Sequence, residues 1–502
     1  MLALASDRGW RSPALFSWLL LPFLTAVAAY AWTLGGFFVS DDFAMLHRAS
    51  TARDWLEASH LPRTGHMSWL RPVSQWSWWV QWGLGGLDPL GYRCLNVAFH
   101  GCNASLVAWL TGVLVRGPGG ELAARRGGAL AGVAFALAPI HPEAVTWLSG
   151  RVDVLSTTGV LVALLAWLRF CQPDGRRRHL ALAYAGLCFG LGAKEMAGTL
   201  PVMAGVLWLV RAGGTGRPRR TRLLGLCTLG VLVGGYVLIR YRVLDGLGGV
   251  ATSEGSSVQS RFDLAHAARF QLRALHLSLA PLHRDFHRGD GHPLYLAQVA
   301  GWLALGGLAT LGARTRASWR ALLLVAATLL VLFVVATAPI AGWGHVNDRN
   351  FMSARYLYLP SVFAAVFLGT LGAWASAAGG RARALAAGAV LLVLGPWTYQ
   401  LFEVNGAWRR AAAECERMLA TLPTQAELPR LAVTGLPDNT GGAYVMRVGF
   451  ELGAELFTDR VHRVVVLEPE AWAVQREKRL SQGVPAAAFR RWDREGGWVT
   501  DP

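Results

Sequence analysis

The chain has 502 residues, of which 53% are hydrophobic and only 16% are charged, and its mean hydropathy is +0.34. Soluble domains average about 25% charged residues, so this composition excludes an ordinary soluble protein and indicates a membrane protein. The net charge of +17 does not indicate nucleic-acid binding, because much of the excess lies in short turns between apolar segments and no basic face carries interleaved aromatic residues.

Apolar segments of roughly 20 residues can cross a bilayer, and the sequence contains about eleven candidates. They run approximately over 14–35, 90–115, 127–140, 153–170, 180–193, 197–211, 223–241, 293–312, 320–339, 356–376 and 384–403. Ala26-Val27-Ala28 could end a cleaved leader, but apolar character continues to Phe38, which favours a retained first span. The predicted fold class is an α-helical multi-pass membrane protein.

Arginine-rich segments precede the first span and follow every second span after it. These arginines are Arg8, Arg11, Arg116, Arg125, Arg126, Arg176, Arg177, Arg178, Arg217, Arg219, Arg220, Arg222, Arg314, Arg316, Arg320, Arg381 and Arg383. Short loops rich in Lys and Arg stay in the cytoplasm, so the N-terminus is predicted inside and the C-terminus outside. The six cysteines show neither a disulfide framework nor paired metal spacing.

Two exterior loops and the tail carry further predicted elements. The long first loop, 36–89, is rich in tryptophan and predicts short helices lying in the membrane interface. The loop after the seventh span contains a basic amphipathic segment, Arg261 to Leu279, which predicts a surface helix. Residues 1–404 then form the membrane domain, and residues 405–502 form an exterior α/β domain. In this tail we expect a helix over Asn405–Leu419, strands over Leu431–Val433 and Val464–Leu467, and a helix over Gly441–Leu456.

Asp41 and Asp42 follow the first span directly and are the strongest candidate catalytic residues. Carboxylates beside hydrocarbon are costly and are typical of functional sites. Adjacent like charges raise the pKa of one partner, which suits a general base that removes a proton from a hydroxyl. The alternative is an N-cap for a helix that starts near Phe43.

The exterior loop between the third and fourth spans carries His141, Glu143, Arg151 and Asp153. His141 and Glu143 could supply a second acid, form a metal pair or contact the acceptor, and Arg151 could hold a lipid phosphate. The alternative is structural, with Pro142-Glu143 opening a helix and Arg151 forming a surface pair with Asp153.

Lys194 is one of only two lysines in the chain and lies beside Glu195 at the end of a span too short to cross the membrane fully. The functional interpretation is a cation that binds phosphate at the floor of a cavity open to the exterior, and the alternative is a mutually neutralised Lys194–Glu195 pair.

The tenth span opens with Arg355, Tyr356 and Tyr358. Arg355 could neutralise a leaving phosphate, and Arg71 in the first loop is a weaker candidate of the same kind. The two tyrosines could contact the donor or could be aromatic residues of the membrane interface.

Several segments together resemble the transmembrane-and-tetratricopeptide-repeat O-mannosyltransferases and their bacterial relatives in the GT-C superfamily. The matching segments occur in the family's order and are Phe38-Val39-Ser40-Asp41-Asp42-Phe43, Trp69-Leu70-Arg71-Pro72-Val73, Leu87-Asp88-Pro89-Leu90-Gly91-Tyr92 with Asn96 and His100, His141-Pro142-Glu143-Ala144-Val145 with Ser149-Gly150-Arg151-Val152-Asp153, Ala193-Lys194-Glu195-Met196 with Thr199-Leu200-Pro201, and Arg355 to Ser361. The sequence departs from the family in its tail, where an α/β unit stands in place of the repeats, so the choice of acceptor could differ.

This resemblance implies a GT-C fold and the transfer of a hexose, mannose in the family, from a polyprenyl-phosphate-sugar donor to an exterior hydroxyl such as Ser or Thr of exported proteins. It places the catalytic carboxylate in the Asp41–Asp42 pair. No cofactor is demanded, although Asp42 and Glu143 could hold a divalent cation. Lipid or polysaccharide acceptors, and a non-catalytic transporter of lipid-linked sugars, stay open as alternatives. The expected location is a bacterial inner membrane, with the donor lipid, an exported acceptor and membrane lipids as partners.

Overall fold

The computed structural model describes residues 14–64, 67–115, 120–211, 218–246, 249–250, 263–283, 292–423, 430–458, 463–467, 469–481 and 488–500. Four of the arginines used to orient the chain (Arg8, Arg11, Arg116 and Arg217) lie outside these residues, as does Arg261 at the start of the predicted surface helix.

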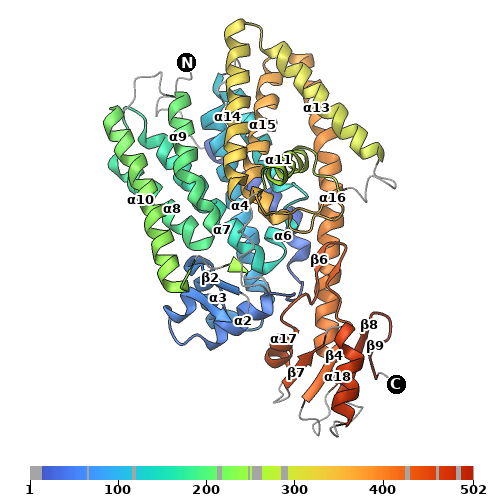
Figure 1. Cartoon of the computed structure of the whole chain (residues 1–502). Coiled ribbons are helices and arrows are strands. Elements are labelled where there is room, and N and C mark those ends of the chain that lie inside the picture. The colour runs from blue at the N-terminus through green and yellow to red at the C-terminus, as the bar shows by residue number, and fades with distance from the viewer. Residues whose placement is uncertain are drawn as a thin grey trace.

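A bundle of apolar helices makes up most of the structure (Figure 1). Its helices are α1 (Ala14–Tyr30), α4 (Pro89–Leu114), α5 (Gly120–Ala136), α7 (Arg151–Phe170), α8 (Arg177–Ala193), α9 (Leu200–Arg211), α10 (Arg219–Leu244), α13 (His292–Gly312), α14 (Arg316–Ala341), α15 (Tyr358–Ser376) and α16 (Gly380–Ala420). Each predicted apolar segment overlaps one of them. Within the described residues, seven helical segments are long and apolar enough to cross a membrane. The multi-pass helical architecture is therefore confirmed, while the number of spans stays a prediction.

The helices differ in how much of their surface the protein covers. The apolar window of the segment that contains α15 is 89% buried, whereas the corresponding windows of α10 and α13 are only 17% and 22% buried. Apolar side chains such as Leu238 on α10 and Leu303 on α13 are exposed. In a membrane protein such residues face lipid, so α15 forms the centre of the bundle, and α10 and α13 form its periphery.

The first loop folds into several short elements at one end of the bundle. They are α2 (Asp42–Thr51), the 3₁₀ turn η3 (Glu57–Ser59), strands β1 (His60–Thr64) and β2 (Met67–Leu70), and α3 (Pro72–Gly85). β2 also pairs with β3 (Gly249–Val250), which follows α10 in the chain. The first loop and the segment after α10 therefore lie on the same side of the bundle. Figure 1 shows α2, α3 and β2 at the end of the bundle from which the C-terminal unit extends.

The predicted interfacial helices of this loop are present, but their tryptophans do not share one environment. Trp55 is 60% exposed, whereas Trp78 on α3 is buried beneath the guanidinium of Arg151, 4.3 Å from its ring centroid. Trp78 therefore does not lie on an exposed face of its helix, because a buried cation occupies that side of α3.

Short helical turns connect the spans near the same end. They are η2 (Ala31–Thr33), α6 (Pro142–Val145), η4 (Leu148–Gly150), η5 (Glu195–Thr199) and η6 (Ala354–Leu357). The predicted surface helix is α11 (Leu264–Leu279), which packs against α14 and α15.

The C-terminal unit is a small α/β fold joined to the bundle by one long helix. α16 is continuous over 41 residues and runs through the predicted domain boundary at 404/405. The unit contains β4 (Arg430–Thr434), β5 (Asn439–Thr440), β6 (Ala443–Tyr444), α17 (Phe450–Phe457), β7 (Arg463–Val466), α18 (Pro469–Ser481), β8 (Phe489–Asp493) and β9 (Gly497–Thr500). Its sheet has the order β7-β4-β8-β9, with β4 parallel to both β7 and β8.

The predicted β-α-β unit is present, but its helix is shorter than expected. Residues 439–444 form the β5–β6 hairpin, and the helix α17 begins only at Phe450. Gly441, Gly442 and Gly449 have positive φ angles of 59°, 89° and 88°. These glycines adopt turn conformations, which interrupt the predicted helix over its first half.

Candidate functional site

Asp42 is the first residue of α2 and is completely buried. Its carboxylate accepts hydrogen bonds from the backbone N–H of Ser149 at 2.8 Å, from the Ser149 hydroxyl at 2.6 Å and from the N–H of Val39 at 3.1 Å. Burial raises the pKa of Asp42 to about 6, although the hydrogen bonds from Ser149 and Val39 oppose the shift. Asp42 thus ties the first loop to the turn before α7.

Asp41 stands at the N-cap position of α2, but its side chain makes no capping hydrogen bond. The residue is only partly buried, in contrast to Asp42. Burial raises the pKa of Asp41, and the charges of Arg355 and Arg447 oppose that rise. The cap interpretation therefore does not account for the Asp41 carboxylate, on which the charges of two arginines act.

Glu143 on α6 and Arg355 on η6 form a buried ion pair. The guanidinium of Arg355 donates to one carboxylate oxygen of Glu143, and the backbone N–H of Arg355 donates to the other at 3.1 Å. The hydroxyl of Tyr444, from the C-terminal unit, also donates to Glu143 at 3.0 Å. Three distant segments of the chain therefore meet at this carboxylate.

Lys194 forms a second buried ion pair, with Asp153. The Nζ of Lys194 lies 2.6 and 2.7 Å from the two carboxylate oxygens, and both side chains are less than a tenth exposed. The interpretation of Lys194 and Glu195 as a neutralised pair is wrong, because the chain turns at Lys194 and directs the two side chains to different partners. The ring of Tyr356 lies 5.0 Å from Lys194 and 5.0 Å from Arg355, and so connects the two ion pairs.

Glu195 belongs to a separate charge cluster. Its carboxylate accepts from Arg71 at 2.9 Å and also pairs with Arg240 on α10. The guanidinium of Arg71 stacks on the ring of Trp69 at 4.2 Å. Arg71 is therefore engaged in joining the first loop to α10.

Arg151 is buried, and its nitrogen atoms face protein acceptors. It donates to the Ser77 hydroxyl at 3.2 Å, to the Gln81 side chain at 2.5 Å and to the Tyr92 carbonyl at 3.4 Å. The predicted surface pair of Arg151 with Asp153 is wrong, because Asp153 binds Lys194 and Arg151 points toward α3. Arg151 stabilises the packing of α3 against α7.

Tyr358 and His141 belong to a packed polar core rather than to an open cavity. The Tyr358 hydroxyl lies 2.7 Å from a ring nitrogen of His100, and Nε2 of His141 lies 2.8 Å from the Ser361 hydroxyl. Tyr358, His100 and His141 are all completely buried. Their placement favours a structural role at the start of α15.

Backbone strain is concentrated around these charges. Among the described residues, positive φ angles at non-glycine positions occur at Ser40, Asp245, Phe351 and Ser353. Ser40 precedes the aspartate pair, and Phe351 and Ser353 precede Arg355. Such conformations cost about 1–3 kcal/mol each and tend to cluster at functional sites.

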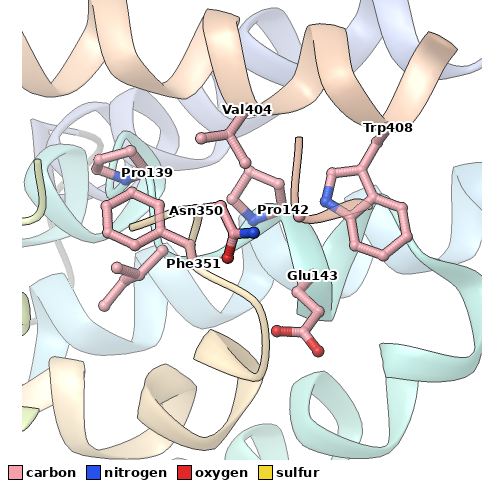
Figure 2. A pocket seen from close by; sticks show the side chains of 9 residues that line it. Pro139, Pro142, Glu143, Asn350, Phe351, Val404 and Trp408 are labelled. Carbon is pink, nitrogen blue, oxygen red and sulfur yellow. The ribbon is translucent and has the colours of Figure 1, made fainter. Parts of the chain in front are cut away.

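A pocket with about 220 Å³ of empty space adjoins Glu143. Figure 2 shows Val404 and Trp408 of α16 facing Pro142 and Asn350, with the Glu143 carboxylate directed away from α16. This space includes open solvent, so the pocket is a small recess beside the ion pair rather than an enclosed donor cavity.

The two carboxylates predicted as metal ligands do not meet. The oxygens of Asp42 face Ser149 and Val39, and those of Glu143 face Arg355 and Tyr444. Within the described part of the chain, no group of three or more His, Cys, Asp or Glu side chains is arranged to hold a metal ion. The residues present do not fit a divalent cation.

Three contributors were not found from the sequence. Arg93 on α4 donates to the Gly36 carbonyl at 2.7 Å and to the Thr146 carbonyl at 3.1 Å, and so positions the loop before Asp41. A charged residue within an apolar span was a usable signal for it. Tyr444 and Arg447 carried no such signal, because they lie in the C-terminal unit and reach the site only through its fold.

The curated relatives match parts of the chain. "Protein O-mannosyl-transferase Tmtc1" of Drosophila melanogaster is 39% identical over 104 residues, which are 21% of this chain and 11% of that protein. "Protein O-mannosyl-transferase Tmtc2" of the same species is 30% identical over 225 residues, which are 41% of this chain and 23% of that protein. The chain thus spans less than a quarter of the length of these relatives. No family model matches it.

The solved structures whose backbones align with this chain have low sequence identity to it. ArnT from Cupriavidus metallidurans bound to undecaprenyl phosphate has 15% identity and a TM-score of 0.45, with coverage of 92% of this chain and 94% of that chain. The Archaeoglobus fulgidus oligosaccharyltransferase in the apo form has 12% identity and a TM-score of 0.49, with coverage of 92% and 65%. The predicted resemblance is confirmed at the level of sequence: along the matched segments this chain is similar to the TMTC-type protein O-mannosyl-transferases.

Proposed function

We propose that this protein is a membrane glycosyltransferase that moves a hexose from a polyprenyl-phosphate-sugar donor to an acceptor hydroxyl. One observation carries the proposal: at the end of an apolar helical bundle, the partly buried Asp41 lies within electrostatic reach of Arg355, which is paired with Glu143. Charged groups in such a place are costly to retain unless they are used. The sequence relatives named as O-mannosyl-transferases support mannose as the sugar and Ser or Thr of exported proteins as the acceptor.

Asp41 is the better candidate for the general base. Its side chain makes no capping bond and is partly accessible, so an acceptor hydroxyl can approach it. All of the Asp42 hydrogen bonds described above hold its carboxylate inside the protein. In this proposal Asp42 positions the loop, and Asp41 removes the proton.

The reaction is a single inverting displacement. The acceptor O–H gives its proton to the Asp41 carboxylate, and the oxygen forms a bond to the anomeric carbon of the sugar. The bond between that carbon and the phosphate oxygen breaks, and its electron pair stays on the departing lipid phosphate. Arg355, whose charge acts on Asp41, stabilises the negative charge that builds on this phosphate in this proposal.

The proposed orientation puts this site outside the cytoplasm of a bacterial cell. It rests on the arginine-rich turns at the opposite end of the bundle and on the common placement of the first loop and the C-terminal unit (Figure 1). A donor lipid in the outer leaflet and exported acceptors would then reach the same face.

The test is transfer from polyprenyl-phosphate-mannose to a Ser/Thr-rich peptide by the purified full-length protein in lipid nanodiscs. We expect Asp41→Asn to reduce kcat at least about a hundredfold, the usual contribution of a general base. Asp54→Asn, a change of an exposed aspartate in the same loop, is the matched control and should leave kcat unchanged. Wild-type turnover in Asp41→Asn would refute the assignment.

The same assay read against pH gives a second criterion. Because burial raises the pKa of Asp41, the protonated, inactive form persists to a higher pH than for an ordinary aspartate. We expect kcat/KM to rise with pH through this raised pKa and then to level off. A profile that is flat from pH 4 to pH 8 would contradict a carboxylate base.

A further inference from the structure

The C-terminal unit contacts the candidate site through α17, which packs against α2, and through residues 439–449. The latter contain the β5–β6 hairpin and are called here the hairpin segment. The carbonyl of Val445 accepts from the N–H of Ser40 at 2.9 Å, directly beside Asp41. The Tyr444 hydroxyl donates to Glu143 and lies 3.2 Å from a guanidinium nitrogen of Arg355. The segment is therefore in direct contact with both the aspartate loop and the Arg355 ion pair.

Glycine at two positions allows this close approach. A Cβ on Gly449 would lie 2.9 Å from the Ser40 carbonyl oxygen, and a Cβ on Gly442 would overlap the Asn350 carbonyl. Both glycines have positive φ angles. The backbone of the hairpin segment thus fits against the loops before Asp41 and Arg355 without intervening side chains.

The cations of the membrane domain at this site are already engaged by the protein: Arg93 and Arg151 donate to carbonyl and side-chain acceptors, and two others are in ion pairs. Arg355 is paired with Glu143, and Lys194 is paired with Asp153. An entering sugar phosphate and a departing lipid phosphate both carry negative charge, which two neutral ion pairs offset poorly. The site as described needs a further cation.

Arg447 of the hairpin segment has the required position and freedom. It lies between Val445 and Gly449, which both contact Ser40, and its guanidinium is 5.4 Å from the ring of Tyr444. Its side chain is half exposed and has a loose partner in the half-exposed Asp438 at 3.5 Å. Exposed pairs of this kind contribute little, so Arg447 can exchange Asp438 for a phosphate. The charge of Arg447 also acts on Asp41.

The topology of the C-terminal sheet supplies an independent argument. β4 has β7 on one side and β8 on the other, so the chain order changes direction at β4. Ligands of open α/β sheets bind beyond the carboxyl ends of the strands at such a point. The chain that leaves the carboxyl end of β4 leads into the hairpin segment, and this edge of the sheet therefore opens toward the candidate site.

We propose that the C-terminal unit completes the active site and that Arg447 binds the phosphate of the polyprenyl-phosphate donor. The inference rests on the proposed glycosyltransferase function and assigns a ligand contact to the C-terminal unit. Arg447 then holds the phosphate on the side of the site opposite the membrane helices, next to the base Asp41.

The test measures equilibrium binding of a short-chain polyprenyl phosphate to the full-length protein in nanodiscs, without turnover. We expect Arg447→Gln to weaken binding about tenfold or more, as for the loss of one charged hydrogen-bond partner, and Arg447→Lys to weaken it less. Arg410→Gln, which removes an exposed arginine of α16, is the matched control and should bind like wild type. The neutral polyprenol should bind equally to all four proteins.

Two outcomes would overturn the inference. Unchanged binding of the polyprenyl phosphate to Arg447→Gln would show that Arg447 does not contact the phosphate. An equal loss of phosphatidylglycerol binding would show that it recognises lipid headgroups in general. Failure of the glycosyltransferase proposal can be told apart from failure of this inference. In that case wild type would show no transfer, but the binding of polyprenyl phosphate could still be compared between wild type and Arg447→Gln.

Discussion

The Asp42 carboxylate illustrates how a charge is kept inside this protein. It has no solvent contact, and three hydrogen-bond donors from Ser149 and Val39 replace its water. These bonds compensate part of the cost of burial, and the remaining cost appears as a pKa raised to about 6. Asp42 therefore contributes to stability in a pH-dependent way that can be measured.

The sign of this contribution follows from the raised pKa. The folded state holds the Asp42 proton more tightly than the unfolded state, in which the pKa is 3.8. The stabilisation is complete below about pH 4 and is lost as the pH rises through about 6, a change of about 3 kcal/mol at 1.36 kcal/mol per pKa unit. We predict that wild type loses about this much unfolding free energy relative to Asp42→Asn between pH 4 and pH 7.

Denaturant unfolding in detergent micelles at the two pH values measures this difference directly. For each protein, the unfolding free energy at pH 7 is subtracted from the value at pH 4. Asparagine cannot accept every hydrogen bond that the carboxylate accepts, but this loss is the same at both pH values and cancels in the subtraction. Asp54→Asn serves as the exposed control and should track wild type at both pH values. Parallel curves for wild type and Asp42→Asn would show that the carboxylate has an ordinary pKa in the folded protein.

At the scale of elements, the contact between the hairpin segment and the aspartate loop depends on Gly449. Its φ angle is 88°, and a Cβ there would press on the Ser40 carbonyl oxygen. Gly497 has a similar φ angle of 78° but no atom within 4 Å of an added Cβ. Replacing either glycine by alanine therefore has the cost of a positive φ angle. Only at position 449 would the new Cβ also be too close to a neighbouring backbone atom.

We predict that Gly497→Ala lowers the unfolding free energy by about 1–2 kcal/mol, the cost of a side chain in the left-handed region. Gly449→Ala should lower it by more, because its Cβ also presses on the Ser40 carbonyl oxygen. Only Gly449→Ala should also reduce transfer activity, because it moves the hairpin segment away from Ser40 and Asp41. Thermal unfolding and the transfer assay on both variants check this. Equal activity in the two variants would indicate that the hairpin segment does not shape the site.

The helices of the bundle could be predicted because their signal is local. A run of apolar residues is enough to place α14 or α15, whatever its neighbours are. The hairpin at 439–444 could not be predicted in this way, since the same residues also fit an amphipathic helix and the turns depend on Gly441 and Gly442. Their conformation is set by the contact with Asn350 on a distant loop.

The candidate site, like the fold, could be predicted only in part from the sequence. The sequence indicates which charged residues border the membrane, and the structure brings Asp41, Glu143 and Arg355 together. It does not indicate their partners, because pairing depends on how the ends of the helices are arranged. Lys194 turns to Asp153 on α7 rather than to its neighbour Glu195, and Tyr444 reaches Glu143 from the other end of the chain.

The whole molecule is polarised along the bundle axis. The first loop, the strand β3 and the C-terminal unit gather at one end, whereas the turn between α15 and α16 lies at the other (Figure 1). Arg381 and Arg383 belong to the first turn of α16, directly after that turn. Basic turns tend to stay in the cytoplasm, so we propose that the site and the C-terminal unit face the opposite compartment.

We predict that single cysteines placed at the exposed positions Asp54 and Glu495 react with a membrane-impermeant thiol reagent added to intact cells. A cysteine at the exposed position Arg381 should react only after the membrane is permeabilised. The native cysteines are first replaced by alanine, and retained transfer activity verifies the fold. If the cysteines at positions 54 and 495 were labelled from different sides of the membrane, the first loop and the C-terminal unit would lie on different sides. Tyr444 could then not contact Glu143, and the proposed site could not form. If both required permeabilisation and Arg381 did not, the site would face the cytoplasm, where exported acceptors are not presented.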